Sequence, residues 1–278
     1  MTILKNVLFF SLVIFMISCQ EGEMPITDKP DDEVPSVTSL KIMAYNVHYC
    51  NPPSMASSFI DIDAVVNVIN GEKPDLVALQ EIDVNTNRSG NINQAQLLAS
   101  KLHMRYFFAK AIDFQGGDYG VLILSKYPIS ETTTHRLPTQ PGSGGEPRVL
   151  ATAKITLPDG NAIRFGSTHL DAQTDDTNRR LQIDRLIEVS GEQNLPFIVG
   201  ADLNAVPNSD VIGKFDAYFT RSCSACPPTF PAINPNRVID YIAFKHPEDK
   251  FSVKSHYVVN EAYSSDHRPI VAIIEIKE

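Results

Sequence analysis

The sequence predicts one α/β domain, made of packed β-sheets with flanking helices, over residues 38–278. Short segments rich in Val, Ile, Phe and Tyr alternate with helical patterns, and Pro, Gly, Asn and Asp separate them. Nothing in this stretch repeats, and it contains no Gly/Ser linker. A chain of 278 residues that is 43% hydrophobic can form one large core, so a single domain of layered sheets and helices is expected.

Ten segments have the composition of strands and three have the spacing of helices. Apolar residues three or four positions apart predict helices around 62–69, 95–102 and 178–192, and the last of these is the most regular. The predicted strands are Leu40–Val47, Leu76–Leu79, Tyr106–Ala109, Gly120–Leu124, Arg148–Leu157, Ala162–Thr168, Phe197–Val199, Val238–Phe244, Ser252–Val259 and Pro269–Ile276.

The N-terminal segment has the pattern of a secretory signal. Lys5 precedes an apolar run that is too short to span a membrane, and the run ends at Ser18-Cys19. This ending resembles the lipobox of bacterial lipoproteins, which implies lipidation at Cys19; a plain signal peptide with an incidental Cys is the alternative. We expect a lipoprotein signal peptide at 1–18, an acidic disordered tether at 19–37, and an exported domain at 38–278 anchored to a membrane in the periplasm or at the cell surface.

The charge distribution excludes a protein that coats nucleic acid. The net charge is −9, and residues 19–37 hold six carboxylates against one lysine, so the domain itself is only mildly acidic. Its basic residues are scattered and Trp is absent, so no basic or aromatic strip of the kind a nuclease needs is visible. Cys223 and Cys226 predict either a local disulfide or two free thiols, since a zinc ribbon would need a second pair, and Cys50 is expected to be unpaired.

Polar side chains stand in or directly after several predicted strands. Buried carboxylates and imidazoles are costly unless they pair or bind an ion, and strand ends are where α/β folds place ligand sites. The residues concerned are Asn46, Gln80, Glu81, His169, Asp171, Asp202, Asn204 and Asp240.

Two of these groups have the spacing of a strand end. Asp202 and Asn204 flank Leu203, which places them on one face, where an acceptor and a donor can orient one water molecule. His169 and Asp171 have the same spacing. Taken alone, Asp202-Leu203-Asn204 is more typical of an Asx-turn, and a single strand-end histidine is more often structural.

A third group lies just before the last predicted strand. Asp266 and His267 are adjacent, and Asp240 is a candidate to fix the tautomer of His267. The carboxylate of Glu81 is a hard oxygen ligand suited to a divalent cation such as Mg²⁺, although a capped turn also explains it. Arg148, close to Glu146, is alternatively an ordinary surface ion pair.

The order of these motifs resembles that of the endonuclease/exonuclease/phosphatase family of metal-dependent phosphohydrolases, over essentially all of 40–276. In two places the chain departs from the family pattern, at Gly120-Val121 and at Ala201, but Asp202 and Asn204 keep their positions. The matching motifs are Ala44-Tyr45-Asn46, Leu79-Gln80-Glu81, Tyr119 to Ile129, Glu146-Pro147-Arg148, Ser167 to Asp171, Arg179-x-x-Gln182, Gly200 to Asn204, Ile239 to Ile242 and Ser265 to Pro269.

The resemblance implies a four-layer sandwich of the deoxyribonuclease type, with two packed mixed sheets between helices, and a role for each motif. Mg²⁺, or alternatively Mn²⁺, would be held by Glu81 with Asn46 and Asp266. Asp202 would align or deprotonate the attacking water, with Asn204 orienting it. His267, paired with Asp240, would contact the phosphate. His169 would contact the phosphate or assist the leaving oxygen, and Arg148 would neutralise the phosphate charge or brace the site.

Family resemblance leaves the substrate open. A phosphodiesterase or phosphatase is expected, with nucleic acid or a GPI or phospholipid head group as alternative substrates; Pro228 to Pro231 resembles a branch linked to GPI-anchor remodelling. Arg88 follows Glu81 closely enough to reach a phosphate. A non-catalytic surface-binding module and a two-carboxylate glycosidase are further alternatives. The protein is expected to be a monomer.

Overall fold

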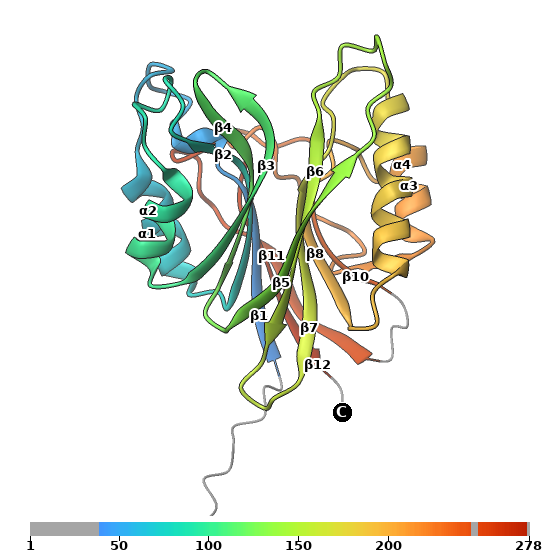
Figure 1. Cartoon of the computed structure of the whole chain (residues 1–278). Coiled ribbons are helices and arrows are strands. Elements are labelled where there is room, and N and C mark those ends of the chain that lie inside the picture. The colour runs from blue at the N-terminus through green and yellow to red at the C-terminus, as the bar shows by residue number, and fades with distance from the viewer. Residues whose placement is uncertain (1–38, 246–249, 277–278) are drawn as a thin grey trace, which may run out of the picture. The chain divides into compact units, whose positions relative to one another are not determined.

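The computed structural model describes residues 39–245 and 250–276. The predicted signal peptide, Cys19 and the tether lie outside the described residues. The described part consists of two six-stranded mixed β-sheets packed face to face, with helices on their outer faces (Figure 1). This arrangement confirms the predicted four-layer fold class.

The first sheet contains the two ends of the domain. Its order is β11-β12-β1-β2-β4-β3, in which β1 and β2 are parallel and the other neighbours are antiparallel. Its strands are β1 (Ser39–Asn46), β2 (Leu76–Val84), β3 (Arg105–Phe114), β4 (Gly117–Ser125), β11 (Phe251–Val258) and β12 (Ile270–Ile276).

The second sheet repeats this pattern. Its order is β5-β6-β7-β8-β10-β9, and its parallel pair is β7 with β8. The sequence shows no repeat, yet each sheet has one parallel pair with antiparallel neighbours on both sides. The strands are β5 (Ile129–Leu137), β6 (Arg148–Thr156), β7 (Ala162–His169), β8 (Phe197–Asp202), β9 (Phe219–Arg221) and β10 (Asp240–Lys245).

Helices close the outer faces. The predicted helices form as α1 (Ile62–Glu72), α2 (Gln94–Leu102) and α3 (Thr177–Gly191), and a fourth helix, α4 (Asp210–Asp216), is added. Side-chain oxygens of Asp61, Asn93 and Ser209 accept hydrogen bonds from first-turn backbone N–H groups and so cap α1, α2 and α4. The apolar sides of α1 and α2 cover the first sheet, and α3 and α4 cover the second (Figure 1).

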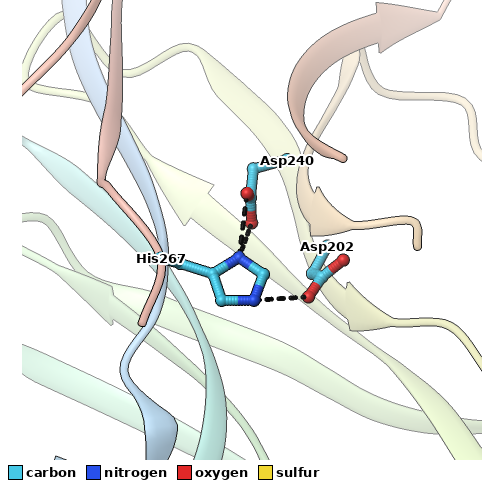
Figure 2. A group of neighbouring side chains, drawn as sticks. All are labelled: Asp202, Asp240 and His267. Atoms are coloured by element: carbon cyan, nitrogen blue, oxygen red, sulfur yellow. Dashed lines mark hydrogen bonds and ion pairs between the residues drawn. The ribbon is translucent and has the colours of Figure 1, made fainter. Parts of the chain in front are cut away.

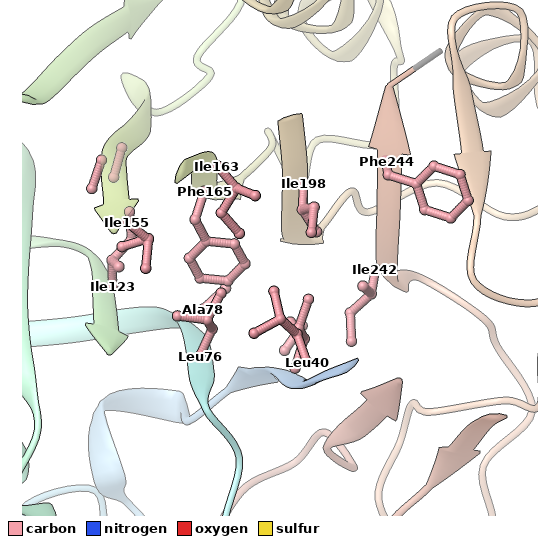
Figure 3. Close-up of a cluster of buried hydrophobic side chains, with 14 of the residues drawn as sticks. Leu40, Leu76, Ala78, Ile123, Ile155, Ile163, Phe165, Ile198, Ile242 and Phe244 are labelled. Carbon is pink, nitrogen blue, oxygen red and sulfur yellow. The ribbon is translucent and has the colours of Figure 1, made fainter. Parts of the chain in front are cut away.

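The main hydrophobic core lies between the two sheets, which approach each other closely at Gly200. Leu40, Leu76 and Ala78 meet Phe165 and Ile198 across the interface (Figure 3), and each fully buried large side chain contributes about 1.5–3 kcal/mol. A Cβ on Gly200 would lie 2.6 Å from the Cβ of Ala78 and 3.1 Å from that of Ala44. The sheets can approach this closely because β8 has no side chain at that position.

The three cysteines of the described residues form one disulfide and leave one free thiol. Cys223 and Cys226 form a disulfide in the loop after β9, which resolves the two alternatives in favour of the local bridge. Cys50 is buried and unpaired, in the short 3-10 helix η1 (His48–Cys50), as expected. No helix within 39–245 and 250–276 is long and apolar enough to cross a membrane.

Candidate active site

The ends of the two parallel pairs meet at one edge of the sandwich. Asn46 at the end of β1 donates from Nδ2 to Glu81 Oε1 (3.0 Å) and to Asp202 Oδ2 (3.0 Å). Glu81 belongs to β2 in the same sheet, whereas Asp202 ends β8 in the other. One amide therefore links carboxylates from both sheets, which sequence spacing alone could only suggest.

A bulge in β2 directs Glu81 toward this edge. The pairing of β2 with β4 shifts register between Leu79 and Ile82, and Glu81 has a left-handed backbone with φ of 60°. A bulge re-aims side chains, and a non-glycine residue in this conformation is strained. Gln80, which lies inside the same register shift, is fully buried and donates to Ser167 of β7. Glu81 is thus the half-buried member of the pair and is free to bind a ligand.

Asp202, Asn204 and His169 form the second part of the site. Asp202 pairs in register with His169 across the parallel strands, and their Oδ2 and Nε2 atoms are 3.4 Å apart. The Asp202 Oδ1 atom accepts the backbone N–H of Asn204 (2.9 Å), and the Asn204 amide lies 3.0 Å from His169 Nε2. The Asx-type hydrogen bond considered from the sequence is therefore present, and it holds Asn204 against the histidine.

His267 and Asp240 form a buried dyad (Figure 2). The Nδ1 atom of His267 lies 3.0 Å from Asp240 Oδ2, and its Nε2 atom lies 3.6 Å from Asp202 Oδ2. Asp240 also accepts a hydrogen bond from the fully buried Thr229 hydroxyl (2.5 Å). The ring of Phe230 lies 4.8 Å from that of His267. Asp240 can therefore hold His267 with Nε2 facing Asp202.

The two histidines have opposite electrostatic environments. Burial disfavours protonation of His267, but the carboxylates of Asp240 and Asp202 outweigh burial and raise the pKa of His267. Burial lowers the pKa of His169, and the Arg148 guanidinium lowers it further. Burial raises the pKa of Asp202, with Asp240 adding to the effect and His267 opposing it. One cationic and one neutral imidazole therefore flank a carboxylate of increased proton affinity, a separation typical of acid–base sites.

The two predicted phosphate-binding arginines differ in placement. Arg148 is 7% exposed, and its Nη1 atom contacts His169 Nδ1 (3.2 Å) and Glu146 (2.9 Å), so it is not a surface ion pair. Arg88 donates from Nε and Nη2 to both oxygens of the buried Asp83. Its guanidinium stacks on the Tyr49 ring at 3.8 Å. Asp83 and the ring thus occupy most of the surface that Arg88 would offer a phosphate.

Asp266 lies in the loop between β11 and β12, directly before His267. The Ser265 hydroxyl donates to the Asn46 carbonyl (2.7 Å), and Asp266 Oδ1 lies 3.4 Å from the same hydroxyl. The half-buried Asp266 is therefore held next to the end of β1. The structure gathers the predicted site residues of both sheets at this edge. Thr229 was named only as part of the run Pro228 to Pro231 and not as a site residue, since a lone Thr before an aromatic residue gives no signal of a hydrogen bond to Asp240.

The oxygen-rich side of the site fits a divalent cation. Glu81 has no basic partner within salt-bridge distance in the described part of the chain, and it shares the Asn46 amide with a second carboxylate. Hard carboxylate and amide oxygens are the ligands that Mg²⁺ and Mn²⁺ take. Donor atoms of Asp202, Asp240 and His267 also lie within 4.8 Å of one another. Because Asp240 already accepts from His267 and Thr229, the Glu81 side suits a cation better.

Comparisons with known proteins agree with the two-sheet fold described above. The model of the Endonuclease/Exonuclease/phosphatase family matches residues 43–267. The fold is similar to that of a family protein from Bacteroides thetaiotaomicron, with a TM-score of 0.73 and 20% identity over 87% of this chain and 99% of that one. It is also similar to a mannosyl-6-phosphatase from the same organism, with a TM-score of 0.68 and 19% identity over 86% and 100%. A third similar structure is the catalytic domain of human Nocturnin, with a TM-score of 0.67 and 18% identity over 86% of this chain and 94% of that one.

Proposed function

The chain belongs to the endonuclease/exonuclease/phosphatase family, and from that premise we propose that it is a metal-dependent phosphoric ester hydrolase that uses an activated water. The family comprises nucleases and phosphatases, which supports hydrolysis of phosphate esters in general. The observation that carries the proposal is the single Asn46 amide that joins Glu81 to Asp202. The Oδ2 atom of Asp202 in turn lies 3.6 Å from the Nε2 atom of His267. In this proposal Glu81 is a metal ligand, Asp202 is the base and His267 is the cation, and the short contacts between these groups support it.

The residues divide the work of the reaction. Glu81, with Asn46 and Asp266, would hold Mg²⁺ or Mn²⁺, which neutralises charge on the phosphoryl oxygens when bound. Asp202 accepts a proton from water as the water oxygen forms a bond to phosphorus, and Asn204 orients that water. The ester P–O bond breaks, and the alcohol oxygen leaves with the electron pair and takes up a proton from solvent. His267 donates a hydrogen bond to the phosphoryl group as its charge grows, and Asp240 holds the imidazole in place.

An activity panel with and without chelator tests the reaction class. Purified residues 38–278 are incubated with p-nitrophenyl phosphate esters, small phosphodiesters, phosphoinositides, plasmid DNA and p-nitrophenyl glycosides, in Mg²⁺ and in EDTA. Hydrolysis that needs Mg²⁺ is expected. Preference for DNA would indicate a nuclease, and preference for phosphoinositides a head-group phosphodiesterase. Full activity in EDTA would refute metal dependence, and hydrolysis of glycosides alone would indicate the two-carboxylate glycosidase.

The Glu81→Ala variant tests the metal assignment. Removal of the half-buried carboxylate should raise the Mg²⁺ concentration needed for half-maximal activity by about tenfold or more, the loss expected for a charged ligand. Arg105→Ala, on an exposed residue at the start of β3, is the control. An unchanged Mg²⁺ titration in Glu81→Ala would remove Glu81 from the metal site.

The proposed location follows from the N-terminal pattern. Residues 1–18 would direct export, Cys19 would carry the lipid, and 19–37 would tether the domain at 38–278 to the membrane as a monomer. Fractionation of cells expressing the full chain tests this. The chain should sediment with membranes and take up labelled palmitate, and Cys19→Ser should abolish the label. Label that persists in Cys19→Ser would refute lipidation at Cys19.

A further inference from the structure

The two site histidines are held at Nδ1 by groups of opposite charge. Nδ1 of His267 faces the Asp240 carboxylate at 3.0 Å (Figure 2), whereas Nδ1 of His169 faces Nη1 of Arg148 at 3.2 Å. An ionised carboxylate only accepts hydrogen bonds, and a guanidinium only donates them. His267 therefore carries a hydrogen on Nδ1, whereas Nδ1 of His169 must offer its lone pair to Arg148.

Packing holds Arg148 in this position. Its side chain is buried at the start of β6, and its Nη1 atom also lies 2.9 Å from Oε1 of Glu146. Tyr119, from β4 of the other sheet, is buried and interacts with the guanidinium through its hydroxyl. Tyr119, Arg148 and His169 line one small cavity between the sheets. Arg148 is thus directed at the histidine by contacts from both sheets.

The other ring nitrogen of His169 faces Asp202. In a neutral imidazole one nitrogen carries the hydrogen and the other the lone pair, so a lone pair on Nδ1 places the hydrogen on Nε2. The Oδ2 atom of Asp202 lies 3.4 Å from Nε2 and can accept this hydrogen. The amide nitrogen of Asn204 is also close to Nε2, but it has its own acceptor in the Leu170 carbonyl (3.1 Å). Burial and the Arg148 guanidinium lower the pKa of His169, which favours the neutral ring.

We infer that Arg148 is a positioning residue that fixes the neutral Nε2–H tautomer of His169, and that His169 serves the reaction only as a hydrogen-bond donor. The inference rests on the proposed function and decides between the two roles that the family resemblance implies for His169. Nε2–H donates to Asp202 or, with substrate bound, to a phosphoryl oxygen, and it keeps its hydrogen throughout. A neutral imidazole that gave this proton to the leaving alcohol would become an anion beside the Asp202 carboxylate, which is unfavourable. The alcohol oxygen therefore takes its proton from solvent.

NMR of the histidine rings tests the tautomer without reference to activity. The full chain is labelled with ¹⁵N at histidine and measured at neutral pH, and the His169 signals are identified by their loss in His169→Asn. The wild type should carry hydrogen on Nε2 and a lone pair on Nδ1. Arg148→Met removes the donor, so His169 should populate the Nδ1–H form or the imidazolium as well. Arg105→Met, on an exposed residue that donates to a backbone carbonyl, should leave the His169 signals unchanged.

Amide replacements of His169 test the role in catalysis. The amide nitrogen of Gln can take the place of Nε2 and donate a hydrogen bond, whereas that of Asn reaches only the place of Nδ1. If a donor is all that the reaction needs, His169→Gln should keep kcat toward p-nitrophenyl phosphate within about tenfold of the wild type. His169→Asn should lower kcat by about a hundredfold or more, the loss expected for one donor to a developing charge.

The outcomes separate this inference from the proposed function. If the wild-type protein hydrolyses none of the phosphate esters, the proposed function is refuted, while the NMR result still decides the tautomer. If it hydrolyses p-nitrophenyl phosphate but its His169 ring is the Nδ1–H form or the imidazolium, only the inference is refuted. A His169→Gln variant that is no more active than His169→Asn would also overturn it, since His169 would then do more than donate a hydrogen bond.

Discussion

Thr229 is the residue whose removal tests the dyad most directly. It is 0% exposed, and its hydroxyl donates to Asp240 Oδ2 at 2.5 Å. Thr229→Val keeps the shape of the side chain and removes the donor. A hydrogen bond to a charged group contributes about 1.5–3 kcal/mol, so the free energy of unfolding should fall by that amount. For a domain of this size, the melting temperature should fall by about 3–12 °C.

Thr229→Val should also lower kcat, which a loss of global stability alone would not do while the variant is folded. With one donor fewer, Asp240 is held less firmly, and His267 loses part of the restraint that aims Nε2 at Asp202. We expect kcat toward p-nitrophenyl phosphate to fall about tenfold, which corresponds to about 1.4 kcal/mol, with KM nearly unchanged. Both quantities are measured at a temperature where the variant is fully folded.

Two further variants make the result interpretable. Thr229→Ser restores the hydroxyl and should recover most of kcat and stability, whereas Thr132→Val, on the exposed face of β5, should change neither by much. If Thr229→Val matches the wild type in kcat and in melting temperature, the hydroxyl does not support Asp240, and this account of how the dyad is held is wrong.

Three other predictions follow from the same structure. Asp202→Asn should lower kcat by about two to four orders of magnitude with the fold intact, since it removes the proposed base; near-normal turnover in steady-state assays would exclude that role. Gly200→Val should destabilise the domain by about 1–3 kcal/mol or more, because even a Cβ would lie 2.6 Å from Ala78; an unchanged urea midpoint would contradict the close sheet packing. Burial lowers the pKa of His256 to about 4 in the folded protein, whereas the exposed imidazole of the unfolded chain has its ordinary pKa of 6.5. Below pH 6.5 the unfolded chain therefore binds a proton that the folded protein does not. Stability should therefore fall by about 2–3 kcal/mol between pH 6.5 and 4, after allowance for partial exposure, and His256→Asn should reduce this fall in urea titrations.

Most of the strands that the sequence predicts are buried, although the edge strands β3 and β11 were also predicted. Segments such as Leu76–Leu79 and Phe197–Val199 carry continuous apolar runs because both of their faces are covered. β5 was not predicted because it is a mostly exposed edge strand in which Thr replaces apolar residues. β9 has three residues and α4 has seven, which is too short for a periodic signal.

The site was predictable where it follows a strand end. Asn46, His169 and Asp202 end their strands, so the alternation of side chains and the position of the ends suggested that they meet. The bulge at Glu81 gives no pattern in the sequence, because its signal is the pairing of β2 with β4. Arg88 illustrates a different limit. Its distance from Glu81 along the chain suggested a phosphate contact, but the buried partner Asp83 becomes visible only in three dimensions.

The pairing of β1 with β12 joins the first and the last strand of the described residues. β12 lies between β1 and β11, so during synthesis one side of β1 has no strand partner until residues 270–276 are available. His267 lies only three residues before β12 and arrives with it. A growing chain that has not reached residue 276 therefore lacks both the closed sheet and the pairing of His267 with Asp240.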